Sequence, residues 1–191
     1  MTVKDLVKKI YADNVAKGYD GHDKYLSRLM IITEISEAVE AIRKDKISYL
    51  MDYKKCRHWG VDLVIAYDKY IHHTLIDELS DIMIRSLDYM ARFAVDLDGE
   101  AVTGNLSHLL QVSISVTSEL FNIEELNLEN LAEIITSCIG DVFEDDDEHF
   151  LSGVMSLAPI LAAKYKISKS DLEYVIFEKI EYNKTSIKKS F

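Results

Sequence analysis

The scarcity of residues that interrupt helices is the feature that most constrains this fold. The chain has 191 residues but only one proline and seven glycines. Because a β-rich fold of this length needs many tight turns, and turns draw on glycine and proline, this scarcity favours long helices. Hydrophobic residues make up 48% of the chain and charged residues 29%, which is typical of a globular protein. The sequence therefore predicts one all-α domain over residues 1–191.

Apolar residues recur every three or four positions along most of the chain, as on the buried face of a helix. In the first half they predict helices over about 3–17, 24–44 and 74–95. Residues 45–73 mix aromatic and basic side chains with one glycine, and they leave open a short helix plus a loop or a hairpin. We expect an irregular connection there. In the second half the pattern predicts helices over about 105–121, 129–143, 148–164 and 168–183.

Charge and composition exclude several classes of partner. The net charge of −11 argues against binding to a nucleic-acid backbone, which needs a basic surface. The N-terminus lacks an apolar signal core, and no apolar run approaches membrane-spanning length, so we expect no membrane partner. Cys56 and Cys138 are far apart and form no CxxC motif, which favours a reduced, cytoplasmic setting. A small phosphate ligand stays compatible with the acidic charge if a divalent metal bridges the anions.

Two spaced pairs of acidic residues are the clearest chemical signal. Glu34 and Glu37 form an ExxE pair inside the apolar run LMIITEISEAVEAI, and Glu78 and Asp81 form an ExxD pair further along. Residues three apart share a helix face, and two helices joined by a connection commonly pack antiparallel. Facing pairs would bring four carboxylates together, and their repulsion calls for a hard cation such as Mg²⁺, with Mn²⁺ as an alternative. The competing interpretation is two solvated helix faces.

Other charged residues lie near these pairs in the sequence. Arg85 follows Asp81 by one turn, so we expect it to hold that carboxylate in place. Glu40 and Asp77 continue the two acidic clusters as surface charges or as outer groups of the site. Lys17 would reach a phosphate or be an ordinary exposed lysine.

Four stretches resemble one known family. TEISEAVEAIRK (33–44) and DELSDIMIRSLDYM (77–90) resemble the signature of the MazG-like, all-α nucleoside triphosphate pyrophosphohydrolases, which is an ExxE pair, a connection and an ExxD pair. Upstream, AKGYD (16–20) is similar to the Lys-Gly-aromatic stretch of that family. EKIEYNKT (178–185) is similar to its C-terminal Lys-x-x-Tyr-Asn-x-Thr segment. The four stretches agree in order over nearly the whole chain.

The resemblance implies a single MazG-like helical bundle that forms homodimers or homotetramers, with core helices at about 3–44 and 74–95 and C-terminal helices at about 105–183. It implies Mg²⁺-dependent hydrolysis of a nucleoside or deoxynucleoside triphosphate to the monophosphate and pyrophosphate. Glu37 would orient the attacking water. Carried over by position, the metal ligands would be Glu34, Glu37, Glu78 and Asp81, and the substrate-binding residues would be Lys17, Arg85, Lys179, Tyr182, Asn183 and Lys184.

The sequence departs from the family pattern in two places. The connection between the acidic pairs, residues 38–77, holds 40 residues and is longer than usual. The tail SIKKSF (186–191) lacks the Arg and the His-Gly-Lys segment of many relatives, for which Lys184, Lys188 and Lys189 would partly substitute. Two other functions stay open: a phosphoribosyl-ATP pyrophosphohydrolase-like enzyme with the same metal cluster, and a non-catalytic helical dimer that acts as a binding module.

Overall fold

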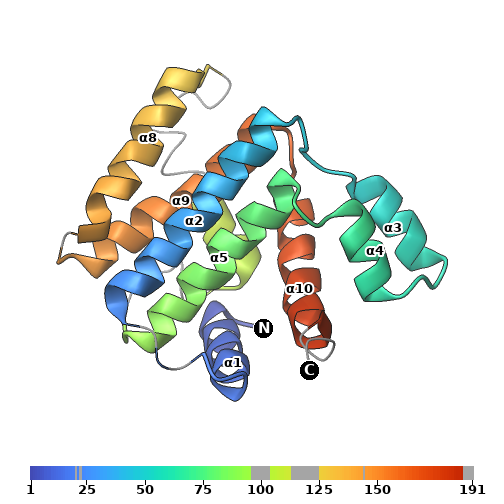
Figure 1. Cartoon of the computed structure of the whole chain (residues 1–191), viewed down its shortest axis with the longest axis horizontal. Helices are drawn as coiled ribbons and strands as arrows, with labels where there is room; N and C mark the ends of the chain where they lie inside the picture. Colours follow the sequence, from blue (N-terminus) through green and yellow to red (C-terminus); the bar gives the residue numbers. More distant parts are fainter. Residues whose placement is uncertain (20, 22, 96–103, 113–124, 144, 187–191) are drawn as a thin grey trace.

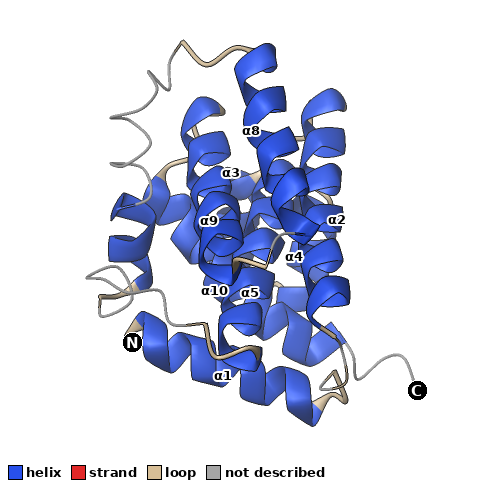
Figure 2. Cartoon of the chain, turned by 90° about the vertical axis from the view of Figure 1, so that its left-hand side faces the viewer, coloured by secondary structure: helices blue, strands red, loops and turns tan. Residues whose placement is uncertain are grey.

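The computed structural model describes residues 1–19, 21, 23–95, 104–112, 125–143 and 145–186 of the chain, and these residues are mainly helical (Figure 2). Within these ranges there is no strand, and the one β-type pairing is an isolated bridge between Thr2 and Asn105. The all-α prediction is therefore confirmed for this part of the chain. None of its helices is long and apolar enough to cross a membrane.

Most predicted helices are found to within a few residues of their expected ends. The predicted helix over 105–121 is described only as far as residue 112, and residues 106–112 are helical. The helices with defined bounds are α1 (Val3–Ala16), α2 (Lys24–Arg43), α3 (Leu50–His58), α4 (Leu63–Tyr70), α5 (Leu75–Arg92), α8 (Leu128–Gly140), the short 3₁₀ helix η1 (Asp141–Phe143), α9 (Asp147–Lys164) and α10 (Lys169–Ser186).

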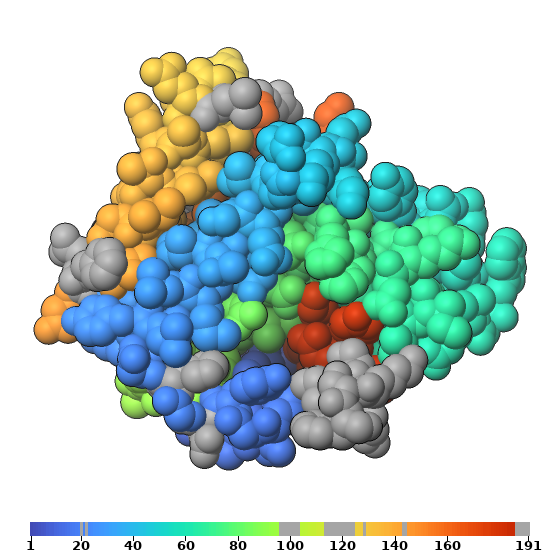
Figure 3. Space-filling model, viewed as in Figure 1, coloured from blue at the N-terminus to red at the C-terminus, as the bar shows by residue number. Residues whose placement is uncertain are grey.

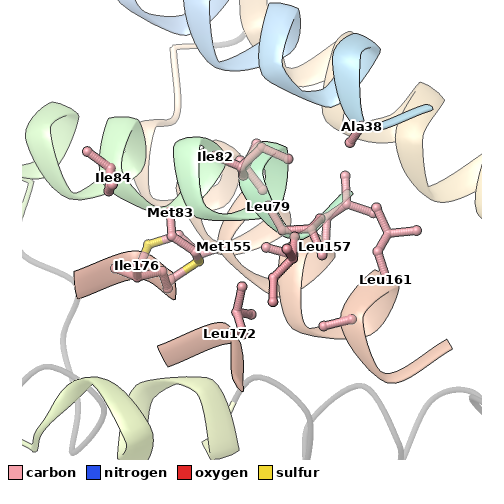
Figure 4. Packing of buried hydrophobic residues seen from close by; sticks show 14 of the residues in the cluster. Ala38, Leu79, Ile82, Met83, Ile84, Met155, Leu157, Leu161, Leu172 and Ile176 are labelled. Atoms are coloured by element: carbon pink, nitrogen blue, oxygen red, sulfur yellow. The ribbon is translucent and has the colours of Figure 1, made fainter. Parts of the chain in front are cut away.

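Helix α5 is the central element of the fold. It contacts α1, α2, α9 and α10, and α2 runs antiparallel beside it (Figure 1). Leu79, Ile82 and Met83 of α5 are fully buried, because the helix is covered on most of its sides. Figure 4 shows Met83 beside Met155 of α9 and Ile176 of α10, with Ile82 on the side of α5 that faces α2. The described helices thus share one hydrophobic core, and polar groups on α5 are held rigidly within it.

A buried arginine fixes the position of α2 along α5. The guanidinium of Arg28 has no exposed surface, and its Nε donates to the hydroxyl of Tyr89 at 2.9 Å. Its other nitrogens donate to the Val142 carbonyl at 2.8 Å and to the Asp147 carboxylate at 2.5 Å. The ring of Phe150 lies 4.9 Å from the guanidinium carbon. Because a buried charge is tolerated only when it is fully paired, these contacts define one register for α2, α5 and α9.

The connection over residues 45–73 is not irregular, so that expectation was wrong. It forms a hairpin of two short helices, α3 and α4, and α4 packs against α10 (Figure 1). Gly60 adopts φ +78° at the turn, a conformation that favours glycine, and the Asp62 carboxylate caps the start of α4. Tyr53 and Tyr67 are fully buried. Helices of nine and eight residues show too few turns for their periodicity to be recognised in the sequence.

Candidate metal centre

The antiparallel packing of α2 on α5 brings three of the four predicted carboxylates together. Glu34 comes from α2, and Glu78 and Asp81 come from α5. One oxygen of each lies within 4.8 Å of the other two. Glu34 and Glu78 are buried, and Asp81 is half-buried. The convergence expected from the two acidic pairs is therefore observed for these three residues, whereas metal binding itself stays a prediction.

Glu37 differs from the other three carboxylates. It lies one turn after Glu34 on α2 but is exposed, and it does not belong to the group within 4.8 Å. Its charge is still close enough to raise the pKa of both Glu34 and Glu78. The structure thus places Glu37 at the edge of the cluster, and its predicted part as a ligand stays untested.

Lys179 supplies a buried positive charge to the cluster. Its Nζ donates to Asp77 Oδ1 and to Asp81 Oδ2, each at 2.6 Å, and the whole residue is only 6% exposed. The resemblance implied that Lys179 binds the substrate, and that role stays a prediction. In the structure its ammonium is engaged by two carboxylates of α5, so an ion pair joins α10 to the centre of the fold.

Asp77 is an outer group of the site and not a surface charge. It is buried and accepts hydrogen bonds from the Tyr67 hydroxyl at 2.8 Å and from the His73 backbone N–H at 2.9 Å, in addition to Lys179. Thr74, three residues before Asp77, is the N-cap residue of α5. Asp77 therefore orients Lys179 and, through it, Asp81.

Arg85 binds a different carboxylate from the one predicted. Its Nε donates to Glu34 Oε1 across the helix pair at 2.5 Å, and no hydrogen bond to Asp81 is found in the described part of the chain. The expected contact within α5 was therefore wrong. The physical reason is that Asp81 already accepts from Lys179, while Glu34 on the facing helix lies within reach and needs a partner.

Burial perturbs all three clustered carboxyl groups. It raises the pKa of Glu34, it raises that of Glu78 to about 9 with help from the charges of Asp77 and Asp81, and it raises that of Asp81 to about 7 although Lys179 opposes it. The causes are physical: desolvation disfavours the charged form, and neighbouring carboxylates repel it. In the metal-free protein the cluster therefore holds protons near neutral pH.

The composition of the cluster fits a hard divalent cation. Among the described residues, four carboxylates (Glu34, Asp77, Glu78 and Asp81) face two cations, Arg85 and Lys179. If every group is ionised, two negative charges are left over, which one divalent ion would balance. The free donors are all carboxylate oxygens, the ligand type that Mg²⁺ prefers.

A cavity of about 310 Å³ adjoins the carboxylates. Helices α1, α2, α5 and α10 contribute to its wall, and the surface is hollowed in this region in Figure 3. Asp81 and Arg85 belong both to this wall and to the charged cluster, so the cavity opens onto the cluster. Two of the predicted substrate-binding residues, Lys17 and Asn183, also line it.

The other predicted substrate-binding residues of α10 have different contacts. The ring of Tyr182 stacks on Tyr67 with centroids 4.5 Å apart, and its hydroxyl donates to Asp68 at 2.6 Å. Lys184 pairs with Asp13 at 3.3 Å and with Glu181 at 3.1 Å. Lys188 and Lys189 lie outside the described residues.

No protein-family model, curated protein or solved structure matches the chain. Membership of the MazG-like family therefore stays a prediction. What the chain does must be inferred from its carboxylates, its cations and its cavity.

The raised pKa of Glu78 predicts that the metal-free protein loses stability as the pH rises. The folded state keeps this proton up to about pH 9, whereas the unfolded chain releases it near the ordinary value of 4.5. Between these pH values the folded state binds more protons than the unfolded chain. The free energy of unfolding should therefore fall by a few kcal/mol as the pH is raised. Urea unfolding in chelator at a series of pH values measures this slope.

The variant Glu78→Gln should reduce that slope, because it removes the group of the cluster whose pKa is raised to about 9. Glu40→Gln is the matched control, since Glu40 is on α2, pairs only with Arg43 and Lys44 in the described residues, and has its pKa lowered to about 2. It should leave the slope unchanged between pH 5 and 9. Equal slopes in wild type and Glu78→Gln would contradict the assignment.

Removing the buried ammonium should destabilise the fold strongly. Lys179→Met leaves Asp77 and Asp81 buried without their cation, which should cost about 3–5 kcal/mol of unfolding free energy. Adding Asp77→Asn should restore much of the loss. Lys184→Met, which removes a more exposed lysine from the same helix, should cost less than about 1 kcal/mol. If both lysine variants have similar stability in denaturant titrations, Lys179 does not have the central part assigned to it.

Proposed function

We propose that this chain is a Mg²⁺-dependent nucleoside triphosphate pyrophosphohydrolase of the MazG-like, all-α type. It would hydrolyse a nucleoside or deoxynucleoside triphosphate to the monophosphate and pyrophosphate. The observation that carries the proposal is the group formed by Glu34, Glu78 and Asp81, whose oxygens lie within 4.8 Å of one another and of which Asp81 lines a cavity. The order of the acidic pairs in the sequence and the convergence of three of their four carboxylates in space support the same activity.

The positive charges beside the cavity suit an anionic substrate. Lys17 lines the wall, and among the described residues it has no ion-pair partner within 4 Å. Partial burial lowers the pKa of Lys17 because desolvation disfavours its ammonium, and an anion bound in the cavity would stabilise that charged form. Arg85 lies in the same wall and shares its guanidinium with Glu34. These two residues would contact the phosphate groups.

Glu34, Glu78 and Asp81 would hold the metal ion, with Glu37 at the edge of the group. When bound, Mg²⁺ would offset the charge of the triphosphate and make the attacking water more acidic. The charge of Lys179 opposes the rise in the pKa of Asp81 that burial causes. It therefore favours the ionised carboxylate, which is the form that binds a metal ion. Arg85 does the same for Glu34.

The remaining steps fall to residues at the edge of the cluster. Glu37 is an exposed carboxylate beside the group, and it would accept a proton from the water that attacks between the α- and β-phosphorus atoms. The basic side chains that stabilise the leaving pyrophosphate would be Lys17 and Arg85. The resemblance also implied substrate binding by Lys179 and Lys184 of α10, but both are paired with carboxylates.

We also propose that the chain forms a homo-oligomer, either a homodimer or a homotetramer. Helix α2 exposes Leu26, Leu29 and Val39, at 44%, 45% and 42%. Leu26 and Leu29 lie one turn apart, and neighbouring exposed apolar side chains can form part of an interface. This supports the oligomer that the resemblance implies.

Metal-ligand variants should abolish the reaction. Wild-type protein should release pyrophosphate from at least one member of a panel of nucleoside triphosphates, deoxynucleoside triphosphates and phosphoribosyl-ATP, and only with Mg²⁺ or Mn²⁺. Glu34→Gln and Glu78→Gln should lower kcat/KM by about a hundredfold or more. Glu40→Gln, a matched change on α2 outside the cluster, should retain activity. The measurement is pyrophosphate release with metal and with chelator.

Two results would count against this function. Release of pyrophosphate that persists in chelator would exclude the metal mechanism. Absence of release from every nucleotide, together with a thermal midpoint that does not respond to Mg²⁺, would favour the non-catalytic binding module, because a true four-carboxylate site gains stability from the ion.

A further inference from the structure

A second polar cluster lies in the cavity wall, further along α5 from the carboxylates. Asp88 and Arg92 follow Asp81 and Arg85 by seven residues, so the four lie on one stripe of the helix. Arg92 Nη2 donates to Asp88 Oδ2 at 3.0 Å, and the two side chains are 6% and 16% exposed. With a rise of about 1.5 Å per residue, Asp88 is about 10 Å along the helix from Asp81.

Three atoms of this cluster lack a hydrogen-bond partner. Asp88 Oδ1, Arg92 Nη1 and Ser27 Oγ are enclosed by protein and are unpartnered in the described part of the chain, and all three residues line the cavity. A buried polar atom without a partner is rare and costly in a native fold. Its presence three times in one wall indicates that a polar ligand supplies the missing partners. A rotation of the Asp88 carboxyl about its Cβ–Cγ bond, a torsion with a broad energy profile, would present its free oxygen to a ligand in the cavity.

The charges at this end are not those of a phosphate site. The guanidinium of Arg92 is neutralised by Asp88, and a phosphate would be repelled by the free oxygen of that carboxylate. Lys17 and Arg85 supply the positive charge elsewhere in the wall. The second cluster instead offers one acceptor, one donor and one hydroxyl that can act as either. An uncharged planar edge with an N–H beside an acceptor, as a nucleobase presents, complements this set.

We infer that Asp88 and Arg92, together with Ser27, recognise the base of the nucleotide. Asp88 Oδ1 accepts from an N–H of the base, and Arg92 Nη1 donates to a ring nitrogen or carbonyl oxygen. The Ser27 hydroxyl forms the third hydrogen bond to the edge of the base. The separation of about 10 Å along α5 is comparable with the distance from the α-phosphorus of a nucleotide to the far edge of its base. The inference rests on the proposed function for the identity of the ligand as a nucleotide.

The wall behind this cluster is held in place by the buried arginine. Tyr89 lines the cavity between Asp88 and Arg92 in sequence, and its hydroxyl accepts from Arg28 at 2.9 Å and donates to Asp147 at 2.5 Å. A base-recognition site needs such a rigid support, because discrimination depends on fixed donor and acceptor positions.

Calorimetric titration with CMP, UMP, AMP and GMP tests the inference without requiring turnover. Wild-type protein should prefer one base over another by about tenfold or more, the size of one good pair of hydrogen bonds to a base edge. Asp88→Asn and Arg92→Lys should reduce this preference to near unity. Their affinity for inorganic tripolyphosphate in the presence of Mg²⁺ should equal that of wild type. Glu40→Gln, which breaks an ion pair on α2 outside the cavity, should change neither the affinity for the monophosphates nor the affinity for tripolyphosphate.

Three outcomes would overturn the inference: no base preference or no nucleotide binding in wild type, an unchanged preference in both variants, or equal losses for tripolyphosphate and for the monophosphates. Thermal midpoints near that of wild type show that the variants are folded. If wild type binds one base selectively and Asp88→Asn removes the selectivity, but no pyrophosphate is ever released, the proposed hydrolysis fails while the base site stands.

Discussion

The ammonium of Lys179, buried between Asp77 and Asp81, is the interaction on which the rest of the site depends. It lies 2.6 Å from a carboxylate oxygen of each residue, and it joins α10 to the central helix α5. Without this cation, two buried carboxylates would face each other beside Glu34 and Glu78. With this cation, the remaining negative charge of the cluster is small enough for the protein to fold and large enough to favour binding of a divalent ion. Stability and proposed activity are thus set by the same few charges.

Much of the fold could be predicted because long helices carry many turns of one pattern. α2 and α5 have 20 and 18 residues, and both were expected from apolar periodicity alone. The hairpin of α3 and α4 could not be recognised in the same way, because its short helices bury only a few side chains, such as Tyr53 and Tyr67. The buried contacts of Arg28 also gave no sequence signal, since its partners come from residues more than sixty positions away.

The sequence predicted which residue types form the site and which helix faces carry them, but not which charged side chains pair with each other. Spacing placed Glu34, Glu78 and Asp81 on facing surfaces, and the structure brings them together. Spacing could not choose among partners within reach, so Arg85 was assigned to Asp81 although it binds Glu34. The partner of Arg85 depends on Lys179, which binds Asp81 and lies 98 positions further along the chain. Electrostatic pairing of this kind is decided by tertiary packing, which a local pattern does not contain.

On the proposed function, the carboxylate cluster binds one divalent cation in place of protons. Calorimetric titration of metal-free protein with Mn²⁺ at pH 7, repeated in buffers of different ionisation enthalpy, measures binding and proton release together. Since Glu78 has a pKa of about 9 and Asp81 of about 7, binding of one ion per chain should release about one to two protons. Absence of binding, or binding without proton release, would contradict the account.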